Sequence, residues 1–150
     1  MNITEQEQTV LDEAAVIMTR ALKKSPNLFS SNADVCGYLS LKVGLLEREV
    51  FGVLYLDINN RLIEDKIMFE GTLSTCPMYP REVMRKALMV NAASIIVYHN
   101  HPSGKAVPTD ADRKMTKEIK RIFGNLDLRV LDHIIVAGLD NYSFQENGDL

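Results

Sequence analysis

Several residue types that mark particular protein classes are scarce in this sequence of 150 residues. The two cysteines, Cys36 and Cys76, are too few and too far apart for a disulfide framework or a thiolate zinc ribbon. Long apolar runs are missing as well, because the run at 92–98 falls far short of the ~18–20 residues that a membrane helix needs. We therefore exclude a disulfide scaffold and expect no membrane partner.

An excess of positive charge is also missing. Lysine and arginine number 17 against 20 aspartates and glutamates, and the net charge of −3 argues against wrapping nucleic acid through bulk charge. The start, MNITEQEQTVLDEAA, has no basic stretch followed by an apolar one, so we expect no secretory signal and a cytoplasmic location. The hydrophobic fraction of 46% is ordinary for a globular protein, and the length predicts a single domain over residues 1–150.

Two helices are predicted in the N-terminal part, residues 1–44, which we expect to pack on the rest of the domain. A second helix is expected from about Ala33 to Val43, with Ser31 or Asn32 as its N-cap. The first helix is predicted from apolar residues that recur at helical spacing. Together with the apolar residues next to them in the sequence, they form one face of the helix. These residues are Val10, Leu11, Ala14, Ala15, Ile17, Met18, Ala21 and Leu22.

The remaining chain alternates strand and helix patterns. A turn signal at Asn59-Asn60 joins the first two strands into a β-hairpin, and the apolar run at 92–98 indicates a central strand buried on both faces. One helix is predicted with Pro80 near its start, and a further helix is predicted to end at Gly124. We expect strands at 49–57, 61–69, 92–98, 128–138 and 141–147, the last at an edge. This order predicts an α/β fold with a mixed sheet sandwiched between helices.

The densest chemical signal, His99-Asn100-His101-Pro102, follows the central strand directly. Residues two apart in extended backbone point to the same side, so both imidazoles can share one zinc ion. A catalytic zinc needs a third protein ligand and an open position for water. Asp112, in the first turn of the next helix, is the natural candidate for the third ligand.

These residues carry a resemblance. His99-x-His101-Pro102, then Thr109, then Asp112 is similar to the JAMM/MPN metalloprotease motif, H-x-H-P-x₆-S-x₂-D. With the segments GTL (71–73), YPREV (79–83) and LDHIIV (131–136), the string HNHPSG resembles the RadC-type branch, from about Leu45 to Leu150. No counterpart of the helix-hairpin-helix module of longer RadC proteins is found, which indicates a short form. The resemblance implies a JAMM/MPN-like (cytidine deaminase-like) architecture.

The resemblance also implies roles for individual residues. His99, His101 and Asp112 match the zinc ligands, and Glu49 matches the catalytic glutamate that activates the zinc-bound water. Thr109 stands where the family has a serine that assists the oxyanion, and Ser103 is a further candidate for that hydrogen bond. The implied function is zinc-dependent hydrolysis of a peptide or isopeptide bond in a peptide or protein substrate.

Other interpretations of the same residues stay open at this point. From the residues alone, Glu47 shares strand parity with Glu49, and only the resemblance selects Glu49. Asp112 also fits a capping box with Thr109, and both roles are compatible. His133, in an apolar strand, is expected to be a satisfied structural histidine. We expect Cys36 to be a small core residue and Cys76 not to be a nucleophile.

Two rival functions come from different classes. The helix after Asp112 carries a basic run, which is either a solvated face or a surface for anions: Arg113, Lys114, Lys117, Lys120 and Arg121. The first rival is a nucleic-acid-associated protein, in keeping with the DNA-repair label of RadC-type proteins. The second is a metal-free interaction scaffold, which the presence of all three matching ligands and of the glutamate disfavours.

Overall fold

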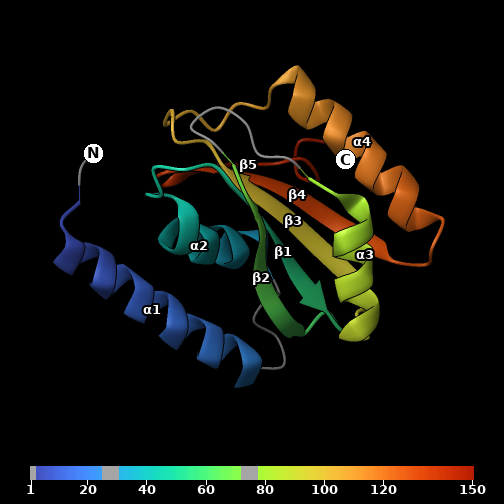
Figure 1. Ribbon diagram of the computed structural model, residues 1–150, viewed down its shortest axis with the longest axis horizontal. Helices are drawn as coiled ribbons and strands as arrows, with labels where there is room; N and C mark the ends of the chain where they lie inside the picture. The colour runs from blue at the N-terminus through green and yellow to red at the C-terminus, as the bar shows by residue number, and fades with distance from the viewer. Residues whose placement is uncertain (1–2, 25–30, 72–77) are drawn as a thin grey trace.

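The computed structural model describes residues 3–24, 31–71 and 78–150, which form a five-stranded mixed sheet with helices on both faces (Figure 1). The strand order is β2-β1-β3-β4-β5; β3 and β4 are parallel, and the other neighbours are antiparallel. The strands are β1 (Val50–Leu56), β2 (Leu62–Glu70), β3 (Ser94–Asn100), β4 (Arg129–Ala137) and β5 (Asp140–Ser143). The helices are α1 (Glu5–Lys24), α2 (Asn32–Val43), α3 (Pro80–Met89) and α4 (Asp110–Gly124). The predicted α/β fold and element order are confirmed.

Local sequence signals explain where these helices begin. The side chain of Ser31 accepts a hydrogen bond from the backbone N–H of Asp34, so Ser31 rather than Asn32 is the N-cap of α2. Pro80 occupies the first turn of α3, where its missing N–H costs nothing. Thr109 and Asp112 form the predicted capping box at the start of α4.

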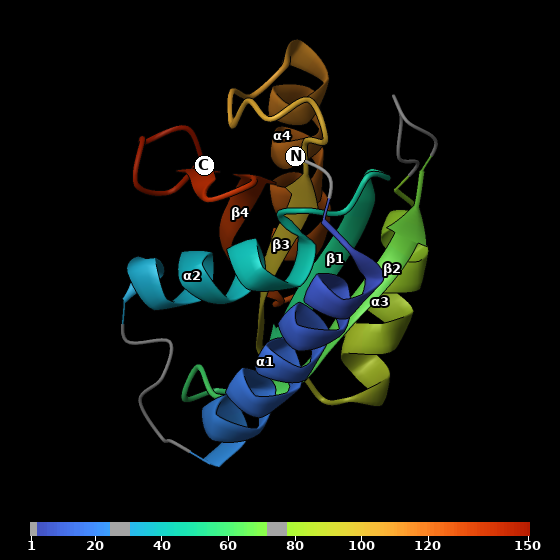
Figure 2. The ribbon, with the colours of Figure 1, turned by 90° about the vertical axis from the view of Figure 1, so that its left-hand side faces the viewer.

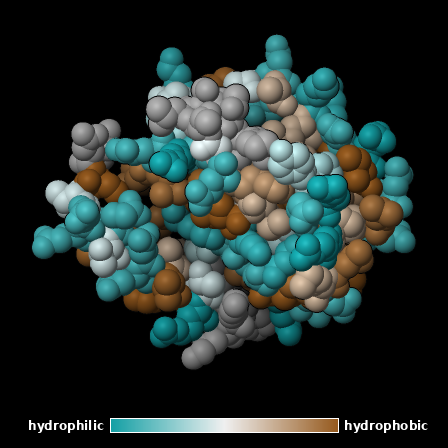
Figure 3. All heavy atoms as spheres, viewed as in Figure 1, coloured by the Kyte–Doolittle hydropathy of each residue, from teal (hydrophilic) through white to brown (hydrophobic). Residues whose placement is uncertain are grey.

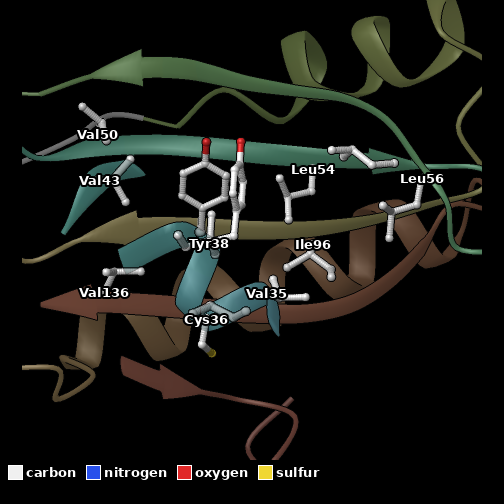
Figure 4. Packing of buried hydrophobic residues seen from close by; sticks show 13 residues of the cluster. Val35, Cys36, Tyr38, Val43, Val50, Leu54, Leu56, Ile96 and Val136 are labelled. Atoms are coloured by element: carbon white, nitrogen blue, oxygen red, sulfur yellow. The ribbon is translucent and has the colours of Figure 1, made fainter. Parts of the chain in front are cut away.

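The sheet separates two apolar layers. Figures 1 and 2 show α1 and α2 on one face of the sheet and α3 and α4 on the other. The first layer joins α2 to the sheet through buried side chains that include Tyr38, Leu39, Leu54 and Ile96 (Figure 4). The second layer joins α3 and α4 to the opposite face, with Val83, Ile119, Phe123, Val53 and Val97 among its buried members. Strand β3 is buried along its whole length, as predicted for a central strand.

A buried carboxylate ties helix α2 to the sheet. Asp65 on β2 accepts hydrogen bonds from the hydroxyls of Tyr38 and Tyr98, and Lys42 Nζ lies 2.6 Å from its Oδ2. Tyr98 reaches Asp65 by crossing over Gly52, where a Cβ atom would lie 2.1 Å from the tyrosine ring. Gly52 is therefore needed for this close approach.

The apolar face of α1 is only partly covered, and the predicted end of the last strand was wrong. Only part of the apolar face of α1 packs, because Val10 and Ile17 are 63% and 62% exposed while Leu11 and Met18 are partly buried. The last strand ends at Ser143 instead of continuing to 147. Its end is fixed by Asp132, whose carboxylate accepts from the Ser143 hydroxyl and from the Gln145 backbone N–H and so turns the chain away from the sheet.

On the face in Figure 3, hydrophobic atoms lie in several separate areas between hydrophilic ones. Among the described residues no helix is both long enough and apolar enough to cross a bilayer. Cys36 is buried, as predicted, and burial raises the pKa of its thiol to about 11. Cys76 and most of the 71–73 segment lie outside the described residues.

Candidate metal centre

Three potential ligands converge at the C-terminal end of β3. His99 Nε2 lies 3.0 Å from His101 Nε2, and the carboxylate of Asp112 approaches both, with distances of 3.1 Å to His99 and 3.4 Å to His101. His99 and Asp112 are buried, and His101 is half-buried. The end of β3 and the residue directly after it supply the two imidazoles on one side of the backbone, as their spacing predicted, and the first turn of α4 supplies the carboxylate.

The outer ring nitrogens of both histidines are engaged elsewhere. His101 Nδ1 lies 3.0 Å from the carbonyl oxygen of Lys105, which can only accept, so this nitrogen carries a proton. His99 Nδ1 lies 2.8 Å from Nε2 of His133. Both Nε2 atoms are therefore turned towards Asp112 and towards each other.

Asp112 is held in place by its own capping box. Its Oδ2 accepts from the backbone N–H and from the hydroxyl of Thr109, each at 2.7 Å. The Thr109 hydroxyl in turn accepts from the Asp112 backbone N–H at 3.2 Å. Helix capping thus occupies Oδ2, which also lies 3.4 Å from His101 Nε2, and leaves Oδ1 directed at His99, so the capping role and the predicted ligand role are compatible.

The charges in this cluster reinforce one another. Burial acts to raise the pKa of Asp112, but hydrogen bonds from His101 and His99 outweigh it and hold the pKa well below its usual range. The hydrogen bond to Asp112 raises the pKa of His101 against the opposing effect of burial. Asp112 is thus a carboxylate at neutral pH.

We expect the metal-free protein to lose stability as the pH rises. The raised pKa of His101 means that its contribution is complete below the ordinary histidine pKa of 6.5 and disappears as the pH passes through the higher folded-state value. Thermal unfolding of chelator-treated protein, compared with His101→Gln across this range, isolates the effect. A difference between the two proteins that does not change with pH would contradict the assignment.

Glu49 lies beside the two histidines. Its carboxylate and the ring nitrogens of His99 and His101 include ligand atoms that all lie within 4.8 Å of one another, and its side chain is half-buried. Glu47, the competing residue, is exposed, and it does not belong to this cluster of described residues. Two carboxylates, those of Asp112 and Glu49, therefore lie near the histidine pair.

Asn100, between the two histidines, fixes the segment that carries Glu49. Its Nδ2 donates to the carbonyl oxygens of Leu46 and Arg48 at 3.2 and 3.0 Å, and its Oδ1 accepts from the Val50 N–H at 2.7 Å. Asn100 is fully buried, so each of these groups would cost about 1–3 kcal/mol if left unpaired. Sequence reasoning missed this residue; a polar side chain at the end of a strand buried on both faces was the only available signal.

His133 is the buried, satisfied histidine that the sequence predicted, but it also touches the site. Besides His99, it contacts the hydroxyl of Thr116 through Nδ1 at 2.6 Å, and its ring stacks on Phe144 with centroids 4.8 Å apart. Burial lowers the pKa of His133 well below its ordinary value, so the ring is neutral. The contact with His99 had no signal in the sequence.

The donor set fits a divalent metal. Tetrahedral ligand atoms at 2.0–2.1 Å from zinc lie about 3.3 Å from one another. His99 Nε2 lies 3.0 Å from His101 Nε2 and 3.1 Å from Asp112 Oδ1, close to that value, and the other carboxylate oxygen, Oδ2, lies 3.4 Å from His101 Nε2. Two imidazole nitrogens and a carboxylate oxygen are also the donor types that zinc prefers.

The comparisons with known proteins identify the family of this chain. A family model described as RadC-like JAB domain matches residues 29–149. The chain belongs to the RadC-like JAB family. The resemblance seen in the motifs is therefore confirmed, and the mixed sheet between helices is consistent with the JAB/MPN-like architecture that it implied.

Individual relatives of this RadC-like chain match along most of its length. UPF0758 protein YkfG of Escherichia coli (strain K12) is 40% identical over 146 residues, which cover 97% of this chain and 92% of the relative. A UPF0758 protein of Vibrio cholerae is 44% identical over 142 residues, covering 95% and 89%. UPF0758 protein PSHAa2643 of Pseudoalteromonas translucida is 46% identical over 143 residues, 95% of this chain but 63% of that longer protein. These names state no activity.

The remaining predicted residues of the RadC-like chain lie outside the cluster. Ser103 lies in the exposed turn two residues after His101. The five basic residues of α4 are exposed, as either interpretation requires. Arg113 is paired with Asp149, and Lys120 donates to the carbonyl of Leu150, so part of this basic face is already engaged with the C-terminal segment.

Proposed function

We propose that this chain is a zinc-dependent hydrolase of a peptide or isopeptide bond. The single observation that carries the proposal is the convergence of His99, His101 and Asp112, at separations of 3.0 to 3.4 Å, beside a second carboxylate, that of Glu49. Asp112, within 3.4 Å of both ring nitrogens, is the third ligand. The Glu49 carboxylate lies farther from the two imidazoles than the Asp112 carboxylate does. It is therefore assigned as the proton acceptor for a water molecule in the open coordination position.

A bound divalent ion supplies Lewis-acid polarisation of the scissile carbonyl and lowers the pKa of a water molecule towards ~7. Glu49 takes the proton of the attacking water on its carboxylate and returns it to the leaving amine. Asn100 keeps the Glu49 segment in position, and the Thr109 hydroxyl orients Asp112. Oxyanion contacts from Thr109 and Ser103 stay a prediction.

Metal analysis together with an activity assay tests this function. Protein purified without chelator should contain about one zinc per chain, and His99→Ala should contain almost none. The wild-type protein should cleave members of a quenched-fluorescent peptide library or isopeptide-linked peptides, lose this activity with a chelator and regain it with zinc. Zinc at full occupancy in His99→Ala would contradict the ligand assignment, and cleavage indifferent to chelator would contradict the mechanism.

A further inference from the structure

A chain of buried polar groups runs from His99 into helix α4. His99 Nδ1 lies 2.8 Å from His133 Nε2, and His133 Nδ1 lies 2.6 Å from the Thr116 hydroxyl. That hydroxyl lies 2.7 Å from the backbone carbonyl oxygen of Asp112, one turn earlier in the helix. His99, Thr116 and His133 are 1%, 2% and 0% exposed, so bulk water cannot replace any of these partners.

The carbonyl at the end of this chain fixes the direction of each hydrogen bond. A carbonyl oxygen only accepts, so the Thr116 hydroxyl donates its single proton to Asp112 and accepts from His133 Nδ1. A neutral His133 that is protonated at Nδ1 has a bare Nε2, which accepts from His99 Nδ1. His99 is then protonated at Nδ1, and Nε2, which faces Asp112 and His101, is its nitrogen for a metal.

We propose that His133 and Thr116 are positioning residues that hold His99 in its metal-binding tautomer. A neutral imidazole has two tautomers, and only the one protonated at Nδ1 offers Nε2 as a ligand. Outer hydrogen bonds of this kind set both the tautomer and the ring orientation of metal-binding histidines. The inference rests on the proposed function, because it assigns the two residues to the same metal centre.

This series of hydrogen bonds also joins two proposed ligands of the metal centre. It begins on the side chain of His99 in β3 and ends on the backbone of Asp112 in α4, while the Asp112 carboxylate returns to His99 Nε2 at 3.1 Å. Phe144 stacks on His133 with an interplanar angle of 7°, which restricts rotation of the connecting ring. The relative position of strand and helix at the site is thus set by groups that do not themselves reach the metal position.

Two substitutions at Thr116 test the proposal. Thr116→Val keeps the shape and removes the hydroxyl, whereas Thr116→Ser keeps the hydroxyl and removes a methyl group. Zinc affinity, measured by competition with a chromophoric chelator, should fall about 10–100-fold in Thr116→Val and stay within about threefold of wild type in Thr116→Ser. If Thr116 had a purely structural role, both substitutions would lower the free energy of unfolding of the metal-free protein. Zinc affinity would then fall in each variant in step with that loss of stability.

A direct measurement of the tautomers needs no variant. In metal-free wild-type protein at neutral pH, ¹⁵N NMR of the imidazoles should find His99 and His133 both protonated at Nδ1. Protonation of a neutral His99 at Nε2, or equal zinc affinity in the two Thr116 variants, would overturn the proposal. Correct tautomers in a wild-type protein that binds no zinc would instead contradict the proposed function, so the two failures are distinguishable.

Discussion

Replacing Glu49 by glutamine is expected to remove most of the hydrolytic turnover while zinc content and folding stay close to wild type. The amide keeps the size of the side chain and one acceptor oxygen, but it cannot take a proton at neutral pH. Loss of a general base of this kind reduces turnover by ~10²–10⁴. The effect should appear in kcat, with KM little changed, because Glu49 acts on the attacking water and not on substrate binding.

Glu47→Gln is the matched control for this experiment. Glu47 precedes the same strand and has the same parity, but it is exposed and lies outside the cluster of Glu49 with the two histidines. Its substitution makes the same change of charge and should leave turnover at the wild-type level. Equal activity in Glu49→Gln and wild type would refute the mechanism.

Zinc content separates the two possible roles of Glu49. The carboxylate of Glu49 is near enough to His99 and His101 to be considered as a ligand itself, since the three groups fall within 4.8 Å of one another. Asp112 makes shorter approaches to both histidines, 3.1 and 3.4 Å, and we therefore assign it as the ligand. Loss of zinc in Glu49→Gln would reverse that assignment.

The parts of the fold and site that the sequence predicted are those encoded locally. Helical spacing of apolar residues, a continuous apolar run and a turn signal located α1, the central strand and the first hairpin, and capping residues or proline marked the starts of α2, α3 and α4. The spacing of His99 and His101 placed both imidazoles on one side of a strand because a strand has a period of two. Asp112 could be added because the capping motif fixed where the next helix begins.

The groups that support the site could not be predicted, because distant parts of the chain supply them. Asn100 bonds to the backbone N–H of Val50, 50 residues earlier, and His133 meets His99 across 34 residues. Neither pairing follows from periodicity; it requires the strand order that places β1 and β4 on either side of β3. A lone asparagine or histidine in an apolar strand therefore indicates a buried partner without identifying it.

For helix α1 and the last strand, the local sequence pattern was present, but the fold used only part of it. An apolar face in a sequence does not say how much of it the fold covers, and α1 packs one side of that face while Val10 and Ile17 stay exposed. The pattern of residues 141–147 fits a strand, but the bonds from Ser143 and Gln145 to Asp132 end it early. In both places tertiary contacts, and not local preference, set the outcome.

Substitution of Asp112 by asparagine is expected to abolish zinc binding at micromolar metal. Thr109 already occupies Oδ2 through two hydrogen bonds, so the single amide oxygen of asparagine is drawn to the helix cap. The amide nitrogen, which has no lone pair for a metal, then faces His99. Removing an outer partner costs a metal site 10–100-fold in affinity, and removing a ligand should cost at least about 100-fold.

Asp110→Asn is the control that isolates this ligand. Asp110 is exposed in the same first turn of α4, so its substitution removes the same charge from the helix N-terminus, an effect of about 0.3–1 kcal/mol on stability. Zinc affinity by chelator competition and thermal stability should be measured on both variants. Without metal we expect Asp112→Asn to be the less stable variant, because it also loses the charged pairing with His99 and His101. A zinc-induced rise in Tm is expected in Asp110→Asn alone. The same rise in Asp112→Asn would mean that Glu49, His99 and His101 hold the ion and that Asp112 serves only as the helix cap.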